Sequence, residues 1–196
     1  EDAETGERMT DEQLCDEMIT MLTAGHETTA NALAWTLQLI SRHPDVLRRL
    51  ESEVDAVLGG RRVSLDDLSA LTYTRQVLKE SMRLYPPVWM VARQATRETE
   101  LGGYRIPKGS YVFMSQWAIH RHPEYWTNPE AFDPDRFGPD RPEPDRFIYM
   151  PFSRGKRQCI GDRFAEMESM LILVTLAQHY RFALEPGYPV VPEASV

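Results

Sequence analysis

The stretch FSRGKRQCIG, residues 152–161, places a cysteine where its thiol could carry chemistry. Cys159 lies just before a strongly helical pattern, so the positive end of a helix dipole would act on it. Arg157 and two further basic residues precede it closely, and both effects favour the thiolate form. Gly155 and Gly161 allow the backbone to approach something flat or bulky.

The loop by itself leaves three uses for this cysteine open. Cys159 could be a small buried hydrophobe, the commonest role of a lone cysteine. It could be a catalytic nucleophile, although the sequence shows no histidine that is obviously paired with it. It could also be the single protein ligand of a metal, an arrangement that suits haem iron.

Composition limits the class of protein. The chain has 196 residues and a net charge of −8, and an acidic balance argues against nucleic-acid binding. Its two cysteines, Cys15 and Cys159, form no disulfide framework, so we expect a reducing compartment and a cytoplasmic location. We expect Cys15 to pack within an apolar helix stripe. No membrane anchor is visible, although the chain begins at Glu1 and an upstream segment could precede it.

The elements that must position the cysteine loop begin with a long helix, predicted over about 11–42. Thr10 starts a T-x-x-Q capping-box pattern, and apolar residues recur at helical spacing until an HP pair ends the helix. Its middle, TAGHETTA, is a poor helix former, because glycine costs about 1 kcal/mol there relative to alanine. Such a local conflict inside a strong helix is where function is expected.

The remaining pattern predicts a mainly α fold with a small β-sheet, of the α+β class. Prolines, glycines and a long coil rich in aromatic residues separate the elements. The predicted segments are a second helix from Pro44 to near Gly59, a helix at about 73–84, a small sheet at about 88–115, the cysteine loop at 152–161 and a final helix at about 162–179.

The cysteine loop matches a known family pattern, F-x-x-G-x-R-x-C-x-G, in full. The matching residues are Phe152, Gly155, Arg157, Cys159 and Gly161. The loop resembles the haem-binding loop of the cytochrome P-450 family, the haem–thiolate monooxygenases. Five fixed positions in a ten-residue window make this a specific signal.

Further motifs match the same family in the same order. The long helix carries A-G-x-E-T-T at residues 24–29, a later helix carries E-x-x-R at 80–83, and P-D-R-F at 134–137 resembles the family's P-E-R-F. Each has a simpler explanation alone: E-x-x-R could be a solvated ion pair, and Thr28 could bond back to a helix carbonyl. Together they identify residues 1–196 as a member, similar to the C-terminal, haem-binding part of a single P-450 domain.

The resemblance assigns roles around a haem b cofactor. It makes Cys159 the axial ligand of the haem iron, with Phe152 packed beside the sulfur and Gly161 in the following turn. It makes Arg157 and Arg93 partners of the haem propionates, although Arg93 could also be an ordinary surface residue of a strand.

The resemblance also assigns the oxygen-binding side. Ala24 and Gly25 would leave room above the iron, and Glu27 and Thr28 would relay protons to dioxygen as general acids. Both side chains are present, which favours oxygen activation over rearrangement of peroxides.

A structural triad is the next implication. Glu80 and Arg83 share a helix face and would meet Arg136 from the coil, which would fix the segment that leads to the cysteine loop.

The implied function is insertion of one oxygen atom from O2 into a hydrophobic small molecule, such as a terpene, a fatty acid or a polyketide. Electrons would come from a ferredoxin or a flavin reductase. The apolar run at residues 88–91 would border the substrate, and Arg154 and Lys156 would dock an acidic donor or else be ordinary solvated charges. The alternative is a non-catalytic haem-binding or interaction module, against which Glu27 and Thr28 argue.

The long helix is apolar on more than one face. We therefore expect a large exposed apolar patch from Met21 to Leu39, poor folding of the isolated chain and no turnover by this chain alone.

Overall fold

The computed structural model describes residue 6 and residues 8–194. Helix α1 spans Asp11–Arg42 and begins at the predicted capping box. The Thr10 hydroxyl accepts a hydrogen bond from the Gln13 amide at 3.2 Å, and the Gln13 side chain accepts one from the Thr10 amide at 2.9 Å. Two of the amides that a helix N-terminus leaves unpaired are thereby satisfied.

The other helices follow the order that the sequence pattern predicts. Proline at the first position opens α2, and Gly59 ends it in the left-handed region at φ 55°. Short 3-10 turns lie in the connections. The helices are α2 (Pro44–Leu58), α3 (Thr72–Leu84), α4 (Gln116–Ile119) and α5 (Asp162–His179), and the turns are η1 (Leu65–Asp67), η2 (Pro134–Phe137) and η3 (Gly155–Arg157).

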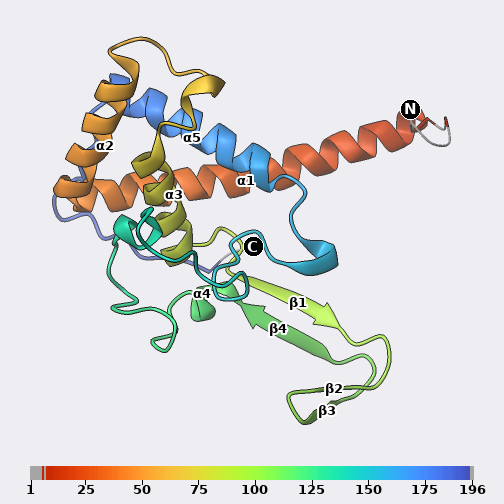
Figure 1. Cartoon of the computed structure of the whole chain (residues 1–196). Helices are drawn as coiled ribbons and strands as arrows, with labels where there is room; N and C mark the ends of the chain where they lie inside the picture. Colours follow the sequence, from red (N-terminus) through yellow and green to blue (C-terminus); the bar gives the residue numbers. More distant parts are fainter. Residues whose placement is uncertain (1–5, 7, 195–196) are drawn as a thin grey trace.

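The core lies where α2, α3 and α5 pack on the C-terminal half of α1 (Figure 1). Ile40 of α1, Leu50 of α2, Val77 of α3 and Leu173 of α5 are completely buried. Burial of one such side chain contributes about 1.5–3 kcal/mol, so this cluster is the main apolar contribution to folding. It holds the E-x-x-R helix, α3, at the centre of the molecule.

A β-hairpin projects away from this helical core (Figure 1). Strand β1 (Met90–Gln94) pairs antiparallel with β4 (Tyr111–Ser115), and Arg93 lies opposite Val112. At its far end β2 (Thr99–Leu101) pairs with β3 (Tyr104–Ile106) across the Gly102-Gly103 turn. Among the described residues the expected small sheet is thus two separate two-stranded ladders, within the predicted α+β class.

The expected exposed apolar patch on α1 is shifted toward the N-terminus, and it overlaps the predicted stretch only at Met21 and Leu22. Leu33 and Leu39 are buried, because α2, α3 and α5 cover that half of the helix. The exposed apolar residues lie in the first half, where Leu22 is 71% exposed. The helical period identified the apolar face, but not which part of it has neighbours. The exposed set is Leu14, Met18, Ile19, Met21 and Leu22.

Cys15 lies in the same exposed half. It was expected to pack inside an apolar stripe, and the structure shows that its side chain is exposed instead. No element covers that stretch of α1 in the described chain, since the contacts of α1 with other helices involve its buried second half.

Candidate functional site

Cys159 lies in the short connection between η3 and α5. Its side chain is exposed and forms no disulfide. Its backbone amide donates a hydrogen bond to the Phe152 carbonyl at 3.0 Å, which closes the loop on itself. Gly155 has φ +83°, a left-handed conformation that a residue with a side chain rarely adopts. The loop therefore holds the thiol out from the backbone in a defined turn.

The sulfur lies at the N-terminal end of α5. A Cβ atom added at Gly161, the residue that precedes α5, would lie 3.9 Å from the Cys159 Sγ. Unpaired amides at a helix N-terminus favour negative charge nearby. Asp162 already uses part of this field, because its carboxylate accepts a hydrogen bond from the Arg163 backbone amide at 2.7 Å.

The residues around Cys159 fit a large apolar group that takes a single sulfur ligand. Ile160 is 91% exposed and Phe164 is exposed as well, so both can pack against such a group. In the described chain no group of three or more histidine, cysteine or acidic residues could hold a bare metal ion. A lone exposed cysteine with apolar neighbours suits a single-sulfur ligand of haem iron.

The two arginines that were expected to face the haem propionates are both exposed. Arg157 lies in η3, and Arg93 lies in β1 with its guanidinium donating to the Ala92 carbonyl at 2.8 Å. Within residue 6 and residues 8–194 neither forms an ion pair with a carboxylate. Both are therefore available to an anionic partner.

The motif in α1 lies in the part of the helix that leaves the core. Ala24, Gly25 and Glu27 are exposed, and Thr28 is half-buried. A Cβ atom at Gly25 would meet nothing within 4 Å, so this face is open. In the described part of the chain, no hydrogen bond or ion pair joins residues 24–28 to the cysteine loop.

Thr28 makes the hydrogen bond that the simpler interpretation foresaw. Its Oγ1 donates to the Ala24 carbonyl at 2.8 Å, within the helix. Thr23 makes the same bond to Ile19 at 2.8 Å. Thr28 can still accept a hydrogen bond, but it must rotate away from Ala24 before it can donate a proton elsewhere.

The structural triad forms inside the core. The Arg83 Nε donates to Glu80 Oε2 at 2.6 Å, and its Nη2 donates to Oε1 at 2.8 Å. The Arg136 Nε reaches the same Oε1 at 3.2 Å. Both Glu80 and Arg83 are 0% exposed. Burial raises the pKa of Glu80, while the two arginines oppose that shift.

Arg83 also ties α3 to the coil that follows α4. Its guanidinium donates to the carbonyls of His120 at 2.8 Å, Pro129 at 2.7 Å and Ala131 at 3.0 Å. Arg136 adds a bond to the Asn128 carbonyl at 2.7 Å. One buried cation therefore organises backbone that has no regular secondary structure.

The sequence patterns do not indicate two residues that link α3 to the segment before the cysteine loop, His120 and Tyr149. His120 is fully buried, and its Nε2 accepts a hydrogen bond from the Met150 amide at 3.0 Å. The Tyr149 hydroxyl donates to the Lys79 carbonyl at 2.9 Å. The aromatic content of the coil was their only signal, since polar rings in a packed coil need buried partners.

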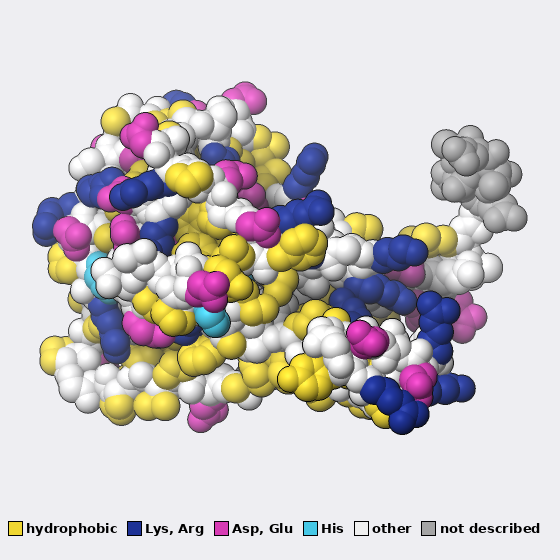
Figure 2. Space-filling view, turned by 60° about the horizontal axis from the view of Figure 1, so that its bottom comes forward, with side chains coloured by type: hydrophobic (Ala, Val, Ile, Leu, Met, Phe, Trp, Pro, Cys, Tyr) yellow, Lys and Arg dark blue, Asp and Glu magenta, His cyan; other side chains and the backbone are white. Residues whose placement is uncertain are grey.

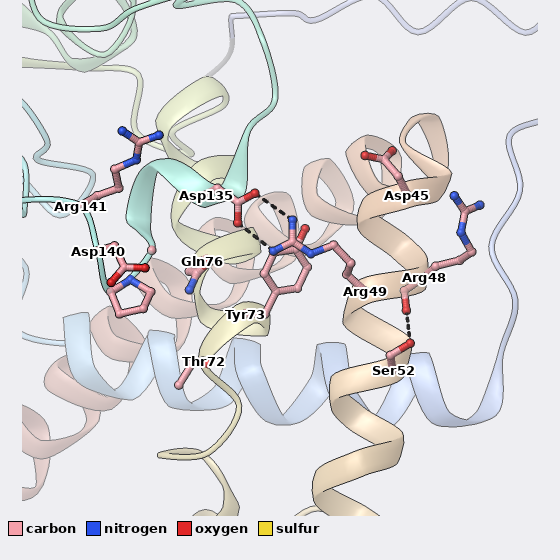
Figure 3. A pocket seen from close by; sticks show the side chains of 12 residues that line it. Asp45, Arg48, Arg49, Ser52, Thr72, Tyr73, Gln76, Asp135, Asp140 and Arg141 are labelled. Carbon is pink, nitrogen blue, oxygen red and sulfur yellow. Dashed lines mark hydrogen bonds and ion pairs between the residues drawn. The ribbon is translucent and has the colours of Figure 1, made fainter.

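A groove of the described chain lies away from the cysteine. It has a volume of about 970 Å³ and lies between α2, α3 and η2 (Figure 3). Arg49 and Asp135 form a bidentate pair there, with both bonds at 2.8 Å, and the Arg49 guanidinium lies 4.0 Å from the Tyr73 ring centre. No residue of the cysteine loop lines this groove, so we assign it a structural role in joining α2 to η2.

Comparison with known proteins identifies the family. The family description "Cytochrome P450" matches residues 1–194. The chain is 43% identical over 188 residues to cyclooctat-9-en-7-ol 5-monooxygenase of Streptomyces melanosporofaciens, covering 95% of this chain and 41% of that protein. It is 39% identical over 192 residues to pentalenene oxygenase of Streptomyces avermitilis, covering 97% and 43%. It is 40% identical over 191 residues to LUTEIN DEFICIENT 5 of Arabidopsis thaliana, covering 95% and 32%.

The chain belongs to the cytochrome P450 family, whose cofactor is haem. It spans about 40% of the length of the Streptomyces relatives that it matches. No helix among the described residues combines the length and the apolarity that crossing a bilayer requires.

The burial of the triad predicts a large cost for a conservative substitution. Arg83→Lys cannot reproduce the forked bonds to Glu80 and the coil carbonyls, so the intact protein should lose about 3–5 kcal/mol of unfolding free energy. Arg105→Lys is the matched control, because its pair with Glu98 is 75% and 57% exposed and should be worth less than about 1 kcal/mol. Denaturant unfolding checks this, and equal losses in the two variants would contradict it.

The burial of His120 predicts acid sensitivity. Desolvation, assisted by the charges of Arg83 and Arg121, lowers its pKa to about 4, although the backbone carbonyls of Met82 and Arg83 oppose the shift. Below pH 6.5 the unfolded chain binds a proton that the folded chain excludes, so stability falls as the pH drops toward 4. The full effect is on the order of 3 kcal/mol.

The measurement is unfolding free energy against pH for the intact protein and two variants. His120→Gln should flatten the slope between pH 6.5 and 4, whereas His122→Gln, at an exposed histidine, should leave it unchanged. Identical slopes for wild type and His120→Gln would show that His120 is not the group responsible.

Proposed function

We propose that this chain carries the haem-binding part of a monooxygenase that inserts one atom of O2 into a hydrophobic substrate. The observation that carries the proposal is the exposed Cys159 thiol at the N-terminus of α5, enclosed by the complete loop motif. Haem b fits the residues present: Cys159 as the iron ligand, Ile160 and Phe164 as apolar contacts, and Arg93 and Arg157 as propionate partners.

Haem supplies the iron centre for oxygen chemistry when bound, and a thiolate ligand favours cleavage of the O–O bond. The protein's contribution at this point is to hold the sulfur in place beside the N-terminus of α5. The α5 N-terminus favours the negative charge, and the Cys159 amide bond to Phe152 keeps the sulfur at the turn of the loop.

Proton delivery is proposed for Glu27 and Thr28. The Glu27 carboxyl is exposed, so it can take a proton from solvent. The Thr28 hydroxyl can pass a proton toward the open face beside Gly25 once it rotates away from the Ala24 carbonyl. Such a relay acts as general acid catalysis by a positioned hydroxyl.

A hydrophobic substrate is proposed from the run Val88–Val91, whose residues lie half-buried at the start of β1. The names of two relatives refer to cyclooctat-9-en-7-ol and pentalenene, which favours a terpene over a fatty acid or a polyketide among the expected classes.

Electrons are proposed to come from a ferredoxin or a flavin reductase. Figure 2 shows Lys and Arg side chains gathered at the end of the molecule that carries the hairpin. Beside the cysteine loop, a cavity of about 240 Å³ is lined by Phe152, by Arg154 and four other basic residues, and by three acidic residues. Arg154, together with the exposed Lys156 of the loop, would meet an acidic donor on this side of the molecule. Both cysteines are unpaired, which is compatible with the proposed cytoplasmic location.

Cys159→Ser is the decisive variant for the ligand. The intact protein should lose the thiolate-type spectrum of its reduced, CO-bound form, since a serine hydroxyl is a much poorer ligand for the iron. Cys15→Ser is the matched control, because that cysteine is also exposed and unpaired. A thiolate-type spectrum that persists in Cys159→Ser would exclude the assignment. Haem binding without dioxygen-dependent turnover in the wild type would support the non-catalytic alternative.

Thr28→Ala tests the relay. The variant should bind haem normally but release more peroxide per product, by about 10-fold or more, because proton delivery to dioxygen is lost. Thr23→Ala removes an equivalent hydrogen bond within the helix and should leave coupling unchanged, while Thr28→Ser should restore it. Wild-type coupling of electrons to product in Thr28→Ala would show that the hydroxyl has no such role.

A further inference from the structure

His120 is hydrogen bonded on two sides within the core. Its backbone carbonyl accepts from the Arg83 guanidinium at 2.8 Å, and its Nε2 accepts from the Met150 amide at 3.0 Å. Because Nε2 is an acceptor, the neutral ring must carry its proton on Nδ1. The residue therefore connects the buried ion pair of α3 to the segment that enters the cysteine loop.

Tyr149 makes a parallel connection. Its hydroxyl donates to the Lys79 carbonyl at 2.9 Å, one residue before Glu80. Its ring centre lies 5.4 Å from that of His120 and 4.8 Å from that of Phe137, so the aromatic contacts restrict both side chains. Two consecutive residues, Tyr149 and Met150, are thus bound to α3 and to His120.

The path from Met150 to the sulfur is short and hydrogen bonded. The Met150 carbonyl accepts from the Ser153 amide at 3.0 Å, and the Phe152 carbonyl accepts from the Cys159 amide at 3.0 Å. Pro151 lies between them and restricts its own backbone. A displacement of Met150 must therefore move Phe152 and, through it, Cys159.

We propose that His120 is a positioning residue that sets the place of Cys159 by linking the Met150 amide to the buried Glu80–Arg83 pair. Arg83 fixes the His120 backbone, and the His120 ring fixes the loop. The importance for chemistry rests on the proposed role of Cys159 as the haem ligand, whereas the link from α3 to the loop stands on the hydrogen bonds alone.

The test compares two amide variants of the haem-loaded intact protein. In His120→Gln the side-chain oxygen can reach the position of Nε2, whereas in His120→Asn the amide ends near the position of Nδ1 and cannot reach Met150. The first readout is hydrogen exchange of the Met150 amide. We expect about 10-fold faster exchange in His120→Asn, from the loss of one partly buried hydrogen bond, and near-wild-type exchange in His120→Gln.

The second readout is the thiolate-type fraction of the reduced, CO-bound spectrum. It should fall in His120→Asn and recover in His120→Gln. Leu50→Ala is the control for lost stability alone. Leu50 lies on α2 in the hydrophobic core, and its substitution should leave both readouts unchanged.

Three results would overturn the proposal. One is unchanged Met150 exchange and thiolate fraction in His120→Asn, and another is equal changes in Leu50→Ala. If neither His120 variant folds, hydrogen exchange of the Met150 amide in the wild-type protein decides. Exchange as fast as that of the exposed loop amides contradicts the link between His120 and Met150. Protection as strong as that of the α3 amides supports the link. A wild-type protein without any thiolate-type spectrum would refute the proposed function, while Met150 exchange would still decide the role of His120.

Discussion

The buried pair of Glu80 and Arg83 is the interaction on which the rest of the structure depends. Both side chains are completely buried, and transfer of an unpaired charge into such a site would cost several kcal/mol. The cost is offset because both side chains make several hydrogen bonds besides those between them. Glu80 accepts from Arg83, from Arg136 and from the Asp133 amide at 2.9 Å, while Arg83 donates to three carbonyls of the coil. A long irregular segment thereby gains a fixed position without a helix or a strand of its own.

The position of the cysteine loop depends on this arrangement. The coil, η2 and the segment before Phe152 surround Arg83, whose guanidinium also lies 5.1 Å from the Trp126 ring centre. Trp126, Phe137 and Tyr149 pack on one another around it. An exposed thiol at a helix N-terminus could be mobile, but here its loop is attached to the most buried part of the molecule. In α1 the arrangement is reversed, since the motif at residues 24–29 lies largely on the exposed half, with only Thr29 buried.

Elements whose signals are local could be predicted from the sequence. The capping box at Thr10, the proline at the start of α2 and the glycine at its end lie within a few residues of the boundaries that they set. The start of α3, predicted at about residue 73 and observed at Thr72, has no local capping signal in the sequence. Its first amides, from Tyr73 and Thr74, are capped at 2.6 and 2.8 Å by Glu53, which belongs to α2. A cap supplied by another helix leaves no local pattern.

The same distinction applies to the site. Ordered motifs predicted the triad, because its residues recur in a known family pattern, but His120 and Tyr149 lie outside any motif and act through backbone atoms of distant segments. The extent of the exposed face on α1 was also misplaced, since a helical period does not specify which neighbours cover which turn.

The central claim is that this fold presents Cys159 as a thiolate ligand to haem. The most direct measurement is the spectrum of the wild-type intact protein, loaded with haem, reduced and exposed to CO. The thiolate-type band should dominate and should persist across the neutral pH range, because hydrogen bonds between uncharged groups fix the loop. A spectrum typical of thiol or imidazole ligation in the folded wild-type protein would contradict the account.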